Sequence, residues 1–137
     1  MAASAAFAGI GTTFTWDSQP IAELTSIGTP SSDAQEIEVT SFDSDDSYRE
    51  FIMGVIDAGT FDIEGNFIPT DTNGQIAMIA DHQARTKVTW VITFADSGNF
   101  TVTGSGYCKT LTLGATYDGK ATFRATIRVT GKATYAA

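Results

Sequence analysis

The sequence is poor in the residues that build cross-links and metal sites. Its 137 residues include one cysteine, one histidine and three prolines. Cys108 alone cannot form an intrachain disulfide, and so low a cysteine count is typical of a reducing compartment. His82 and Cys108 together cannot supply the four ligands of a structural zinc site. We therefore exclude a disulfide scaffold and a structural zinc protein, and we expect no cofactor.

Positive charge and long apolar runs are scarce as well. Eight Lys and Arg stand against sixteen Asp and Glu, so the net charge is −8, whereas binding to nucleic acid needs clustered bases. No apolar run approaches the roughly 20 residues of a membrane span. The first base is Arg49, so the small apolar start lacks the basic segment of a signal peptide. We expect neither specific DNA binding nor a membrane protein.

The overall composition predicts a folded chain with a single domain over residues 1–137. Apolar residues make up 42% of the chain and charged residues 18%, which is enough apolar surface to build a core. We interpret residues 1–11 as a flexible N-terminal arm that leads into the first strand. Residues 131–137 are interpreted as a C-terminal arm.

Charge is divided unevenly along the chain. Residues 1–70 contain twelve acids and one base, a net charge of −11, whereas residues 71–137 contain four acids and seven bases, a net charge of +3. If the two halves form different surfaces, the acidic face of one copy complements the basic face of another, as in head-to-tail association. Alternatively, strand pairing interleaves the two halves and the asymmetry disappears.

Alternating apolar and polar residues predict a mainly β fold. Threonine, whose branched Cβ favours strands, occurs 21 times. The alternation covers four stretches, residues 36–40, 59–69, 86–96 and 121–131. Such a pattern indicates sheets with one buried face. Gly104 and Gly106 indicate a bulge or a close backbone approach. We predict a β-sandwich or barrel of about seven to eight strands.

One α-helix is predicted at about residues 73–84. Thr72 and Gln75 have the spacing of a capping box, in which two side chains bond the first free backbone N–H groups of a helix. Ile76 and Ile79 then begin an apolar stripe at helical spacing. We expect this helix to pack against the sheet.

A second helical pattern interrupts the strands at about residues 43–58. Its apolar residues are spaced i, i+3, i+4, i+7 and i+8, namely Tyr48, Phe51, Ile52, Val55 and Ile56. Ser47 and Glu50 have the spacing of another capping box. Asp45 and Asp46 would lie where the helix dipole favours negative charge. We predict a long loop or a short amphipathic helix here.

The acids of this segment can also be compared with a calcium loop. An EF-hand would place oxygen ligands at Asp43, Asp45 and Ser47, a glycine at position 48 and a glutamate at position 54. The sequence has Tyr48 and Gly54 at those two positions. Because the turn glycine and the bidentate ligand are both missing, helix capping and surface charge explain the acids better, and we predict no metal site.

Catalytic interpretations of other polar residues are weaker. His82 could act with Cys108 or Ser105, but it stands near the end of the predicted helix, where a histidine is commonly solvated or a favourable end charge. Asp62 and Glu64 share a strand face and could be paired carboxylates. A solvated or intersubunit face is the simpler interpretation, because both alternate with apolar residues.

Two remaining patterns also favour a structural interpretation. Trp16, Trp90 and Tyr107 could form a sugar-binding platform, but Trp90 alternates with core-type residues. The Gly-Ser-Gly at 104–106 lacks the lysine and the helix of a phosphate loop. We therefore predict that the chain is not an enzyme.

Residues 36–68 resemble the signature region of the tail tube proteins of long-tailed phages. The family has a strand that ends in a motif like Val-Thr-Ser, an acidic loop with Tyr-Arg-Glu-Phe, and then an acid and a glycine before the next strand. Here these are residues 39–41, 43–46 and 48–51, followed by Asp57 and Gly59. Residues 11–31 are also similar to the opening strands of the family, and the resemblance extends over most of residues 11–130.

The resemblance implies a structural role in the virion. Family members combine a β-sandwich or barrel with a flanking helix and assemble into hexameric rings, which stack into a tube that conducts DNA at ejection. Expected partners are further copies of the chain, a tail tip or initiator complex, a tape-measure protein and a tail terminator. Double-stranded DNA would pass without specific binding. Assembly would take place in the cytoplasm of the bacterial host, and the product would lie in the tail.

The resemblance also implies which residues take part in assembly, since the loop between early strands and the terminal arms bridge copies in the family. The expected self-assembly residues are Asp43, Asp45, Asp46, Tyr48, Arg49, Glu50 and Phe51. We expect Tyr48 and Phe51 to bury against a neighbouring copy, with Arg49 paired to an acid there, because aromatics and arginine dominate interfaces. The alternative is that four apolar residues cover the core of their own subunit, which leaves only the acids for contact: Tyr48, Phe51, Ile52 and Val55.

Two other functions remain open from the sequence. One is a monomeric β-sandwich module that binds a glycan or another virion protein, and it would stay small at high concentration. The other is the tube component of a contractile or secretion apparatus, which an adjacent sheath gene would reveal.

Overall fold

The computed structural model describes residues 6–43 and 45–136 of the chain. The described residues form nine strands, one α-helix and a short 3₁₀ turn. The elements are β1 (Thr13–Trp16), β2 (Gln19–Pro20), β3 (Leu24–Ile27), β4 (Asp33–Glu38), η1 (Asp45–Ser47), β5 (Phe51–Asp57), β6 (Thr60–Asn66), α1 (Gln75–Ala84), β7 (Val88–Thr93), β8 (Thr101–Gly114) and β9 (Thr122–Ala136). The predicted mainly β fold with one helix is confirmed.

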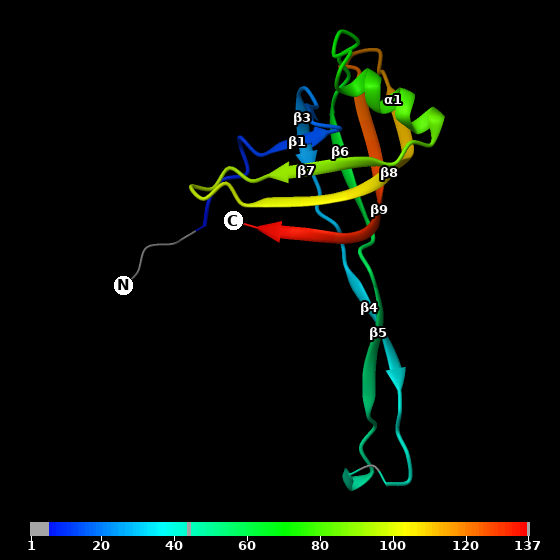
Figure 1. The fold of residues 1–137 in the computed structure, drawn as a ribbon. Helices are drawn as coiled ribbons and strands as arrows, with labels where there is room; N and C mark the ends of the chain where they lie inside the picture. The colour runs from blue at the N-terminus through cyan, green and yellow to red at the C-terminus, as the bar shows by residue number, and fades with distance from the viewer. Residues whose placement is uncertain (1–5, 44, 137) are drawn as a thin grey trace.

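Seven strands form one antiparallel sheet in the order β2-β1-β7-β8-β9-β6-β3, and β4 and β5 form a separate two-stranded sheet. The large sheet curls like half a barrel, with α1 near one end (Figure 1). The β4–β5 hairpin projects away from this body in the opposite direction (Figure 1). The molecule therefore has two parts, a body and a projecting hairpin.

The core of the body consists of alternate strand residues, as the alternation in the sequence predicts. Alternate residues of β6, β7 and β9 are buried, among them Ile63, Trp90 and Ile127, and their neighbours are more exposed. Phe61 packs edge-on against Trp90 with 4.7 Å between ring centroids, and against Phe14 with 5.8 Å. Such pairs add to the stabilisation from burying apolar area.

Strands β8 and β9 are long and bend together halfway along their length (Figure 1). Their register shifts between Thr103 and Ser105, opposite Gly131, which has a positive φ of 80°. A Cβ on Gly104 would meet the Trp90 ring, and one on Gly106 would meet the carbonyl of Arg128. The prediction of a bulge or a close approach at these two glycines is therefore confirmed.

The two terminal segments that the sequence predicts as arms differ in structure. Residues 131–136 continue β9 and pair with β8, with Thr101 opposite Ala136, so the prediction of a C-terminal arm is wrong there. The bulge at Gly131 lets the strand resume its pairing after the point where we expected it to end. Within the predicted N-terminal arm, residues 6–11 form a bend and turn outside any strand, and residues 1–5 lie outside the described part.

Helix α1 starts slightly later than predicted and without the predicted capping box. The cap position is Gly74, which provides no side-chain bond, and the Gln75 backbone N–H donates to Asp71 Oδ2 at 3.0 Å. The Gln75 side chain is fully buried and bonds three backbone groups of the body. Thr72 and Gln75 have the right spacing, but burial of Gln75 under the sheet overrides the local cap.

The charged halves of the sequence interleave in the body. Arg124 on β9 pairs with Asp62 on β6 at 3.4 Å, and Arg128 pairs with Asp57 at 2.9 Å. Bases of the second half thus neutralise acids of the first half within one subunit. These two ion pairs reduce the charge difference between the two halves, whereas the hairpin keeps an excess of acids.

Candidate assembly interface

The hairpin, residues 33–57, is a strand pair, and its described residues, 33–43 and 45–57, include no α-helix. Strands β4 and β5 pair antiparallel, and Val39 N donates to Glu50 O at 2.8 Å just beyond them. The prediction of a loop or amphipathic helix at 43–58 is wrong from residue 51 onward. Residues 51–56 are a continuous apolar run, which matches helical spacing and a strand equally well. Gly54 and the β-branched residues favour the strand.

The tip of the hairpin, residues 39–50, contains the remaining predicted site residues. A 3₁₀ turn over Asp45–Ser47 reverses the chain, with Asp46 and Ser47 at positive φ values of 50° and 61°. In the predicted capping box the Glu50 N–H would bond the side chain of Ser47, but it donates instead to the side chain of Thr40, at 2.8 Å from Oγ1. The structure brings Asp43, Asp46, Tyr48, Arg49, Glu50 and Phe51 together at or next to the tip, and the side chain of Asp45 lies outside the described part.

Large apolar side chains of the hairpin point into solvent. Tyr48 is 75% exposed and Phe51 is 48% exposed, so neither covers the core of its own subunit. The remaining exposed members are Ile37, Val39, Phe42, Ile52, Met53, Val55 and Ile56. The alternation at residues 36–40 therefore marks no buried face in the single chain. So many neighbouring apolar side chains in water are typical of a protein-binding surface.

Most of these exposed residues escaped the sequence-based prediction, which named only Tyr48 and Phe51. Phe42 is completely exposed at the tip. The signal that could have revealed the set is the run at 51–56, which is apolar on both faces of a strand. Such a strand needs cover on both sides, and β4 alone cannot provide it.

Nearly all of the net charge belongs to the hairpin. Residues 33–57 contain eight acids and one base, a net charge of −7. The rest of the chain contains eight acids and seven bases, a net charge of −1, so the two parts account for the total of −8. The hairpin is therefore both apolar and strongly acidic.

The single base of the hairpin pairs within it. Arg49 Nε donates to Glu38 Oε2 at 2.7 Å and Arg49 Nη2 donates to Glu38 Oε1 at 3.3 Å, whereas the sequence predicted a partner on another copy. The hydrogen bonds from Arg49 and Thr40 lower the pKa of Glu38. The guanidinium also lies 5.7 Å from the centre of the Phe51 ring. Arg49 thus helps to order the tip.

The groups weighed as catalytic have structural roles. His82 Nδ1 lies 2.7 Å from the carbonyl oxygen of Cys108 and holds α1 to β8. Burial raises the pKa of the Cys108 thiol to about 12, with a smaller contribution from Asp81, so the thiol is unreactive near neutral pH. Asp62 accepts a hydrogen bond from Thr126 Oγ1, which is the main cause of its lowered pKa.

The aromatic residues weighed as a sugar platform do not form one. Trp16 and Trp90 are buried in the core, and only Tyr107 is exposed. The Trp16 indole donates to Asp81 Oδ2 at 2.8 Å, which joins β1 to α1. Among residues 6–43 and 45–136, no three His, Cys, Asp or Glu side chains are arranged to hold a metal ion. No helix in the described part of the chain is long and apolar enough to cross a membrane.

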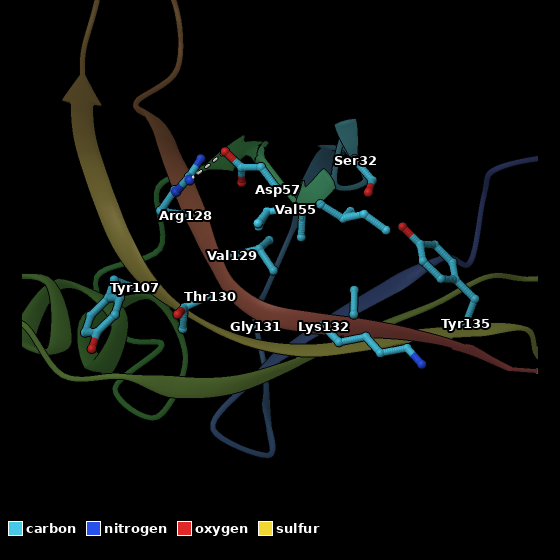
Figure 2. Close-up of a pocket in the computed structure, with 13 residues that line it drawn as sticks. Ser32, Val55, Asp57, Tyr107, Arg128, Val129, Thr130, Gly131, Lys132 and Tyr135 are labelled. Atoms are coloured by element: carbon cyan, nitrogen blue, oxygen red, sulfur yellow. Dashed lines mark hydrogen bonds and ion pairs between the residues drawn. The ribbon is translucent and has the colours of Figure 1, made fainter. Parts of the chain in front are cut away.

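A groove of about 920 Å³ lies where the hairpin joins the body. One wall is the end of β5 with Val55 and Ile56, and the other is the second half of β9 with Val129, Ala133 and Tyr135 (Figure 2). The Arg128–Asp57 ion pair lies at the same place (Figure 2). The hydrogen bond to Asp57 from Arg128, and then that from the Gly59 N–H, lower the pKa of this carboxyl.

Fold and surface together define a mainly β protein whose most prominent feature is a surface suited to protein contacts. The family model described as phage tail tube protein matches residues 24–135. The chain belongs to the phage tail tube protein family, which confirms the resemblance noted in its sequence. It is therefore a structural component and not an enzyme. No curated protein matches the sequence.

Solved structures of tails and injection systems share the fold. A chain in the virion of a native gene transfer agent particle has a TM-score of 0.79 and 20% identity, covering 96% of this chain and 100% of that one. A chain from the C6-symmetric tail of the empty gene transfer agent particle has a TM-score of 0.68 and 20% identity, with coverages of 87% and 86%. A chain from the sheath/tube terminator structure of an extracellular contractile injection system, PVC, has a TM-score of 0.78 and 13% identity, with coverages of 99% and 100%.

Proposed function

We propose that the chain is the major subunit of a tail tube in which six copies form a ring and stacked rings enclose a channel. Double-stranded DNA would pass through this channel at ejection. The observation that carries the proposal is the family match over residues 24–135. The six-fold symmetry of the gene transfer agent tail, which contains a chain of the same fold, supports the ring size.

The electrostatics of the chain suit a channel for DNA. Outside the hairpin the chain has a net charge of −1 and so no excess of the lysine and arginine on which lasting contact with phosphates depends. Two of the arginines, Arg124 and Arg128, are already paired with Asp62 and Asp57. A wall of this kind lets a duplex slide.

The hairpin is the proposed assembly element. Its tip contains the acids Asp43, Asp45, Asp46 and Glu50 beside Arg49, Tyr48 and Phe51. In a ring or stack, the exposed apolar side chains would be buried against neighbouring copies at about 25 cal/mol per Å² of apolar area. Assembly would thereby bury a large apolar surface that is exposed to water in the single chain.

The proposal extends to partners and location. A tail tip or initiator would start the tube, a tape-measure protein would occupy it and a terminator would close it. The chain would assemble in the cytoplasm of the bacterial host and reside in the tail of the virion. Because PVC is a contractile system, the tube of a contractile or secretion apparatus stays the nearest alternative, and copurification with a sheath protein would favour it.

Negative-stain electron microscopy of the purified protein before and after concentration tests the function. Rings or hollow tubes with a pore wide enough for a DNA duplex are expected. Uniform particles with a light-scattering mass near 14.5 kDa at every concentration, even after addition of a tail-tip initiator, would favour a monomeric binding module.

A matched pair of tyrosine variants tests the hairpin itself. Tyr48→Ala removes an exposed aromatic from the tip, and Tyr117→Ala removes a fully exposed one from the β8–β9 loop. Interface aromatics commonly contribute about 2 kcal/mol or more to binding, so Tyr48→Ala should raise the concentration needed for tubes by more than about tenfold. Tyr117→Ala should leave it unchanged. Equal effects of the two changes, with both variants folded, would remove the hairpin from the interface.

A further inference from the structure

The groove at the base of the hairpin is apolar along most of its length. Val55, Ile56, Val129, Ala133 and Tyr135 line it from two sides. Figure 2 shows Val129 and Tyr135 on the same side of β9, facing the opening below the end of β5. With a volume of about 920 Å³, the groove is large enough for more than one bulky side chain.

The charged residues of the groove leave an excess positive charge. Arg128 is paired with Asp57, whereas Lys132 makes no ion pair with any described residue. Lys132 is one of the residues that line the groove. In Figure 2 its side chain runs along β9 on the side away from Val129 and Tyr135, and its long, flexible stem can bring the ammonium group round the strand to the rim. An occupant that suits the groove is therefore apolar with acids next to it.

The tip of the hairpin has this composition. Phe42 is completely exposed, and Asp43 and Asp46 follow it within four residues. An aromatic side chain that enters an apolar groove while neighbouring carboxylates meet a lysine is a common form of anchor at interfaces.

The tip of the same chain cannot reach its own groove. The root of the hairpin, Val55–Asp57, is part of the groove wall, while the tip lies at the other end of β4 and β5 (Figure 1). The six residues of β4 alone span about 20 Å at about 3.3 Å per residue. An occupant with this tip must come from another molecule.

We propose that the groove receives the hairpin tip of a second copy of the chain, with Phe42 in the apolar part and Asp43 beside Lys132. This inference rests on the proposed function and names the partner surface of the hairpin. The tip and the groove are different surfaces, so each copy donates one and accepts one. A contact of this kind forms a closed ring if the rotation from one copy to the next adds up to a full turn, and an open filament if it does not.

Charge reversal tests the pairing. Lys132→Glu places an acid opposite the acidic tip, and like charges at an interface oppose association by several kcal/mol. We expect at least a tenfold loss of sedimentable tubes at a fixed protein concentration. Asp43→Lys in the Lys132→Glu background should restore them, because it recreates an opposite pair. Lys120→Glu, which makes the same change in the β8–β9 loop, is the matched control and should assemble like the wild type.

Cross-linking between copies provides the second readout. Ser41→Cys protein, which keeps Phe42, is mixed with Thr130→Cys protein, whose cysteine lies in the groove wall, and a short bis-maleimide is added after assembly. Cys108 is buried and contributes little background. We expect a covalent dimer on a denaturing gel, whereas Ser41→Cys with Tyr117→Cys should give none.

The two proposals fail in distinguishable ways. If wild-type protein makes tubes but Lys132→Glu assembles normally and the pair of Ser41→Cys and Thr130→Cys gives no cross-link, the groove is not the partner surface and the tube function stands. If wild-type protein makes no rings or tubes even with an initiator, the tube function fails and the groove pairing fails with it. Circular dichroism of each variant ensures that a loss of assembly is not a loss of folding.

Discussion

At the scale of single residues, Gln75 illustrates how much a buried polar side chain can organise. Its Nε2 donates to the carbonyls of Ala22 and Asn66 at 3.0 and 2.8 Å, and its Oε1 accepts from the Ile68 N–H at 2.9 Å. The side chain thus ties the start of α1 to the segments around β2 and β6. The three backbone groups depend on it, because buried polar groups without partners are costly.

We predict that Gln75→Leu lowers the free energy of unfolding by about 3 kcal/mol or more, since each stranded backbone group costs about 1–3 kcal/mol. Urea denaturation followed by circular dichroism measures the change. Gln83→Leu makes the same substitution at an exposed position of α1 and should change stability by less than about 0.5 kcal/mol. Similar losses for the two variants would show that the bonds of Gln75 matter little.

The ion pairs between β6, β9 and the hairpin root predict loss of stability in acid. The pKa of Asp57 is lowered mainly by Arg128, and that of Asp62 mainly by Thr126. A carboxyl with a lower pKa in the folded state stabilises the fold above its unfolded pKa of about 3.9, and the contribution disappears as pH falls through the folded pKa. Both groups are half exposed, so solvent screening keeps the effect small.

We therefore expect the Tm of the wild type to be nearly constant down to about pH 5. Between about pH 5 and about pH 2, the Tm of the wild type should fall by a few degrees more than that of an Asp62→Asn variant. At neutral pH the same variant should have a lower Tm than the wild type. Asp118→Asn, in the β8–β9 loop, is the control and should follow the wild-type curve. Parallel curves for wild type and Asp62→Asn would contradict the linkage.

At the scale of elements, period-two alternation identified the strands whose two faces have different surroundings. It worked for β6, β7 and β9, where Ile63, Trp90 and Ile127 are buried and their neighbours are more exposed. The alternation could not identify β5, because a strand with two apolar faces, both of which would be buried on assembly, shows no alternation. The acidic tip was found from its residues, but its strand-like geometry depends on pairing with β4, which is not a local property.

The last half of β9 was missed for a related reason. Gly131 has a positive φ, and a glycine near the end of a chain ordinarily indicates the end of a strand. Here it forms the bulge at which β9 bends and continues along β8. The sequence could not predict the groove either, because the groove forms where residues 55–57 and residues 128–135, which are far apart in the sequence, come together.

Gly59 is the joint between hairpin and body, and we predict that it tolerates no side chain. Its φ is +80°, and a Cβ there would collide with the carbonyl oxygen of Ser31. Gly131 has the same φ but open space around its Cβ position. Gly131→Ala should therefore lose about 1–2 kcal/mol from backbone strain alone, and Gly59→Ala should lose more.

Urea unfolding of the two alanine variants separates the collision from the strain. Equal losses would mean that the hairpin can shift to relieve the contact with Ser31. In that case the joint is adaptable, and the direction of the hairpin is set by the Val129 N–H bond to the Gly59 carbonyl and by neighbouring contacts.

At the scale of the whole molecule, the concentration of charge in the hairpin predicts how assembly responds to salt. Each copy has a net charge of −8, of which −7 belongs to residues 33–57. Copies therefore repel one another at long range, over a screening length of about 30 Å at 0.01 M salt and about 10 Å at 0.1 M. Light scattering should show faster assembly at the higher salt concentration.

Neutralising acids of the hairpin away from Asp43 should weaken this dependence. We expect an Asp33→Asn and Glu36→Gln double variant, which changes exposed acids of β4 away from the tip, to assemble faster than the wild type at low salt and to gain less from added salt. A Glu23→Gln and Asp118→Asn double variant removes the same charge from the body and serves as control. Assembly that slows as salt is added would mean that attraction between tip and groove outweighs the repulsion.

The burial of both tryptophans has an optical consequence. Trp16 and Trp90 are the two tryptophans of the chain, and both lie in the core of the body, whereas the hairpin contains none. Intrinsic tryptophan emission therefore reports whether the body is folded and is insensitive to what the hairpin binds. In a polymerisation experiment, the emission spectrum should stay constant while scattering rises. A subunit that unfolds and aggregates would instead show a shift to longer wavelengths.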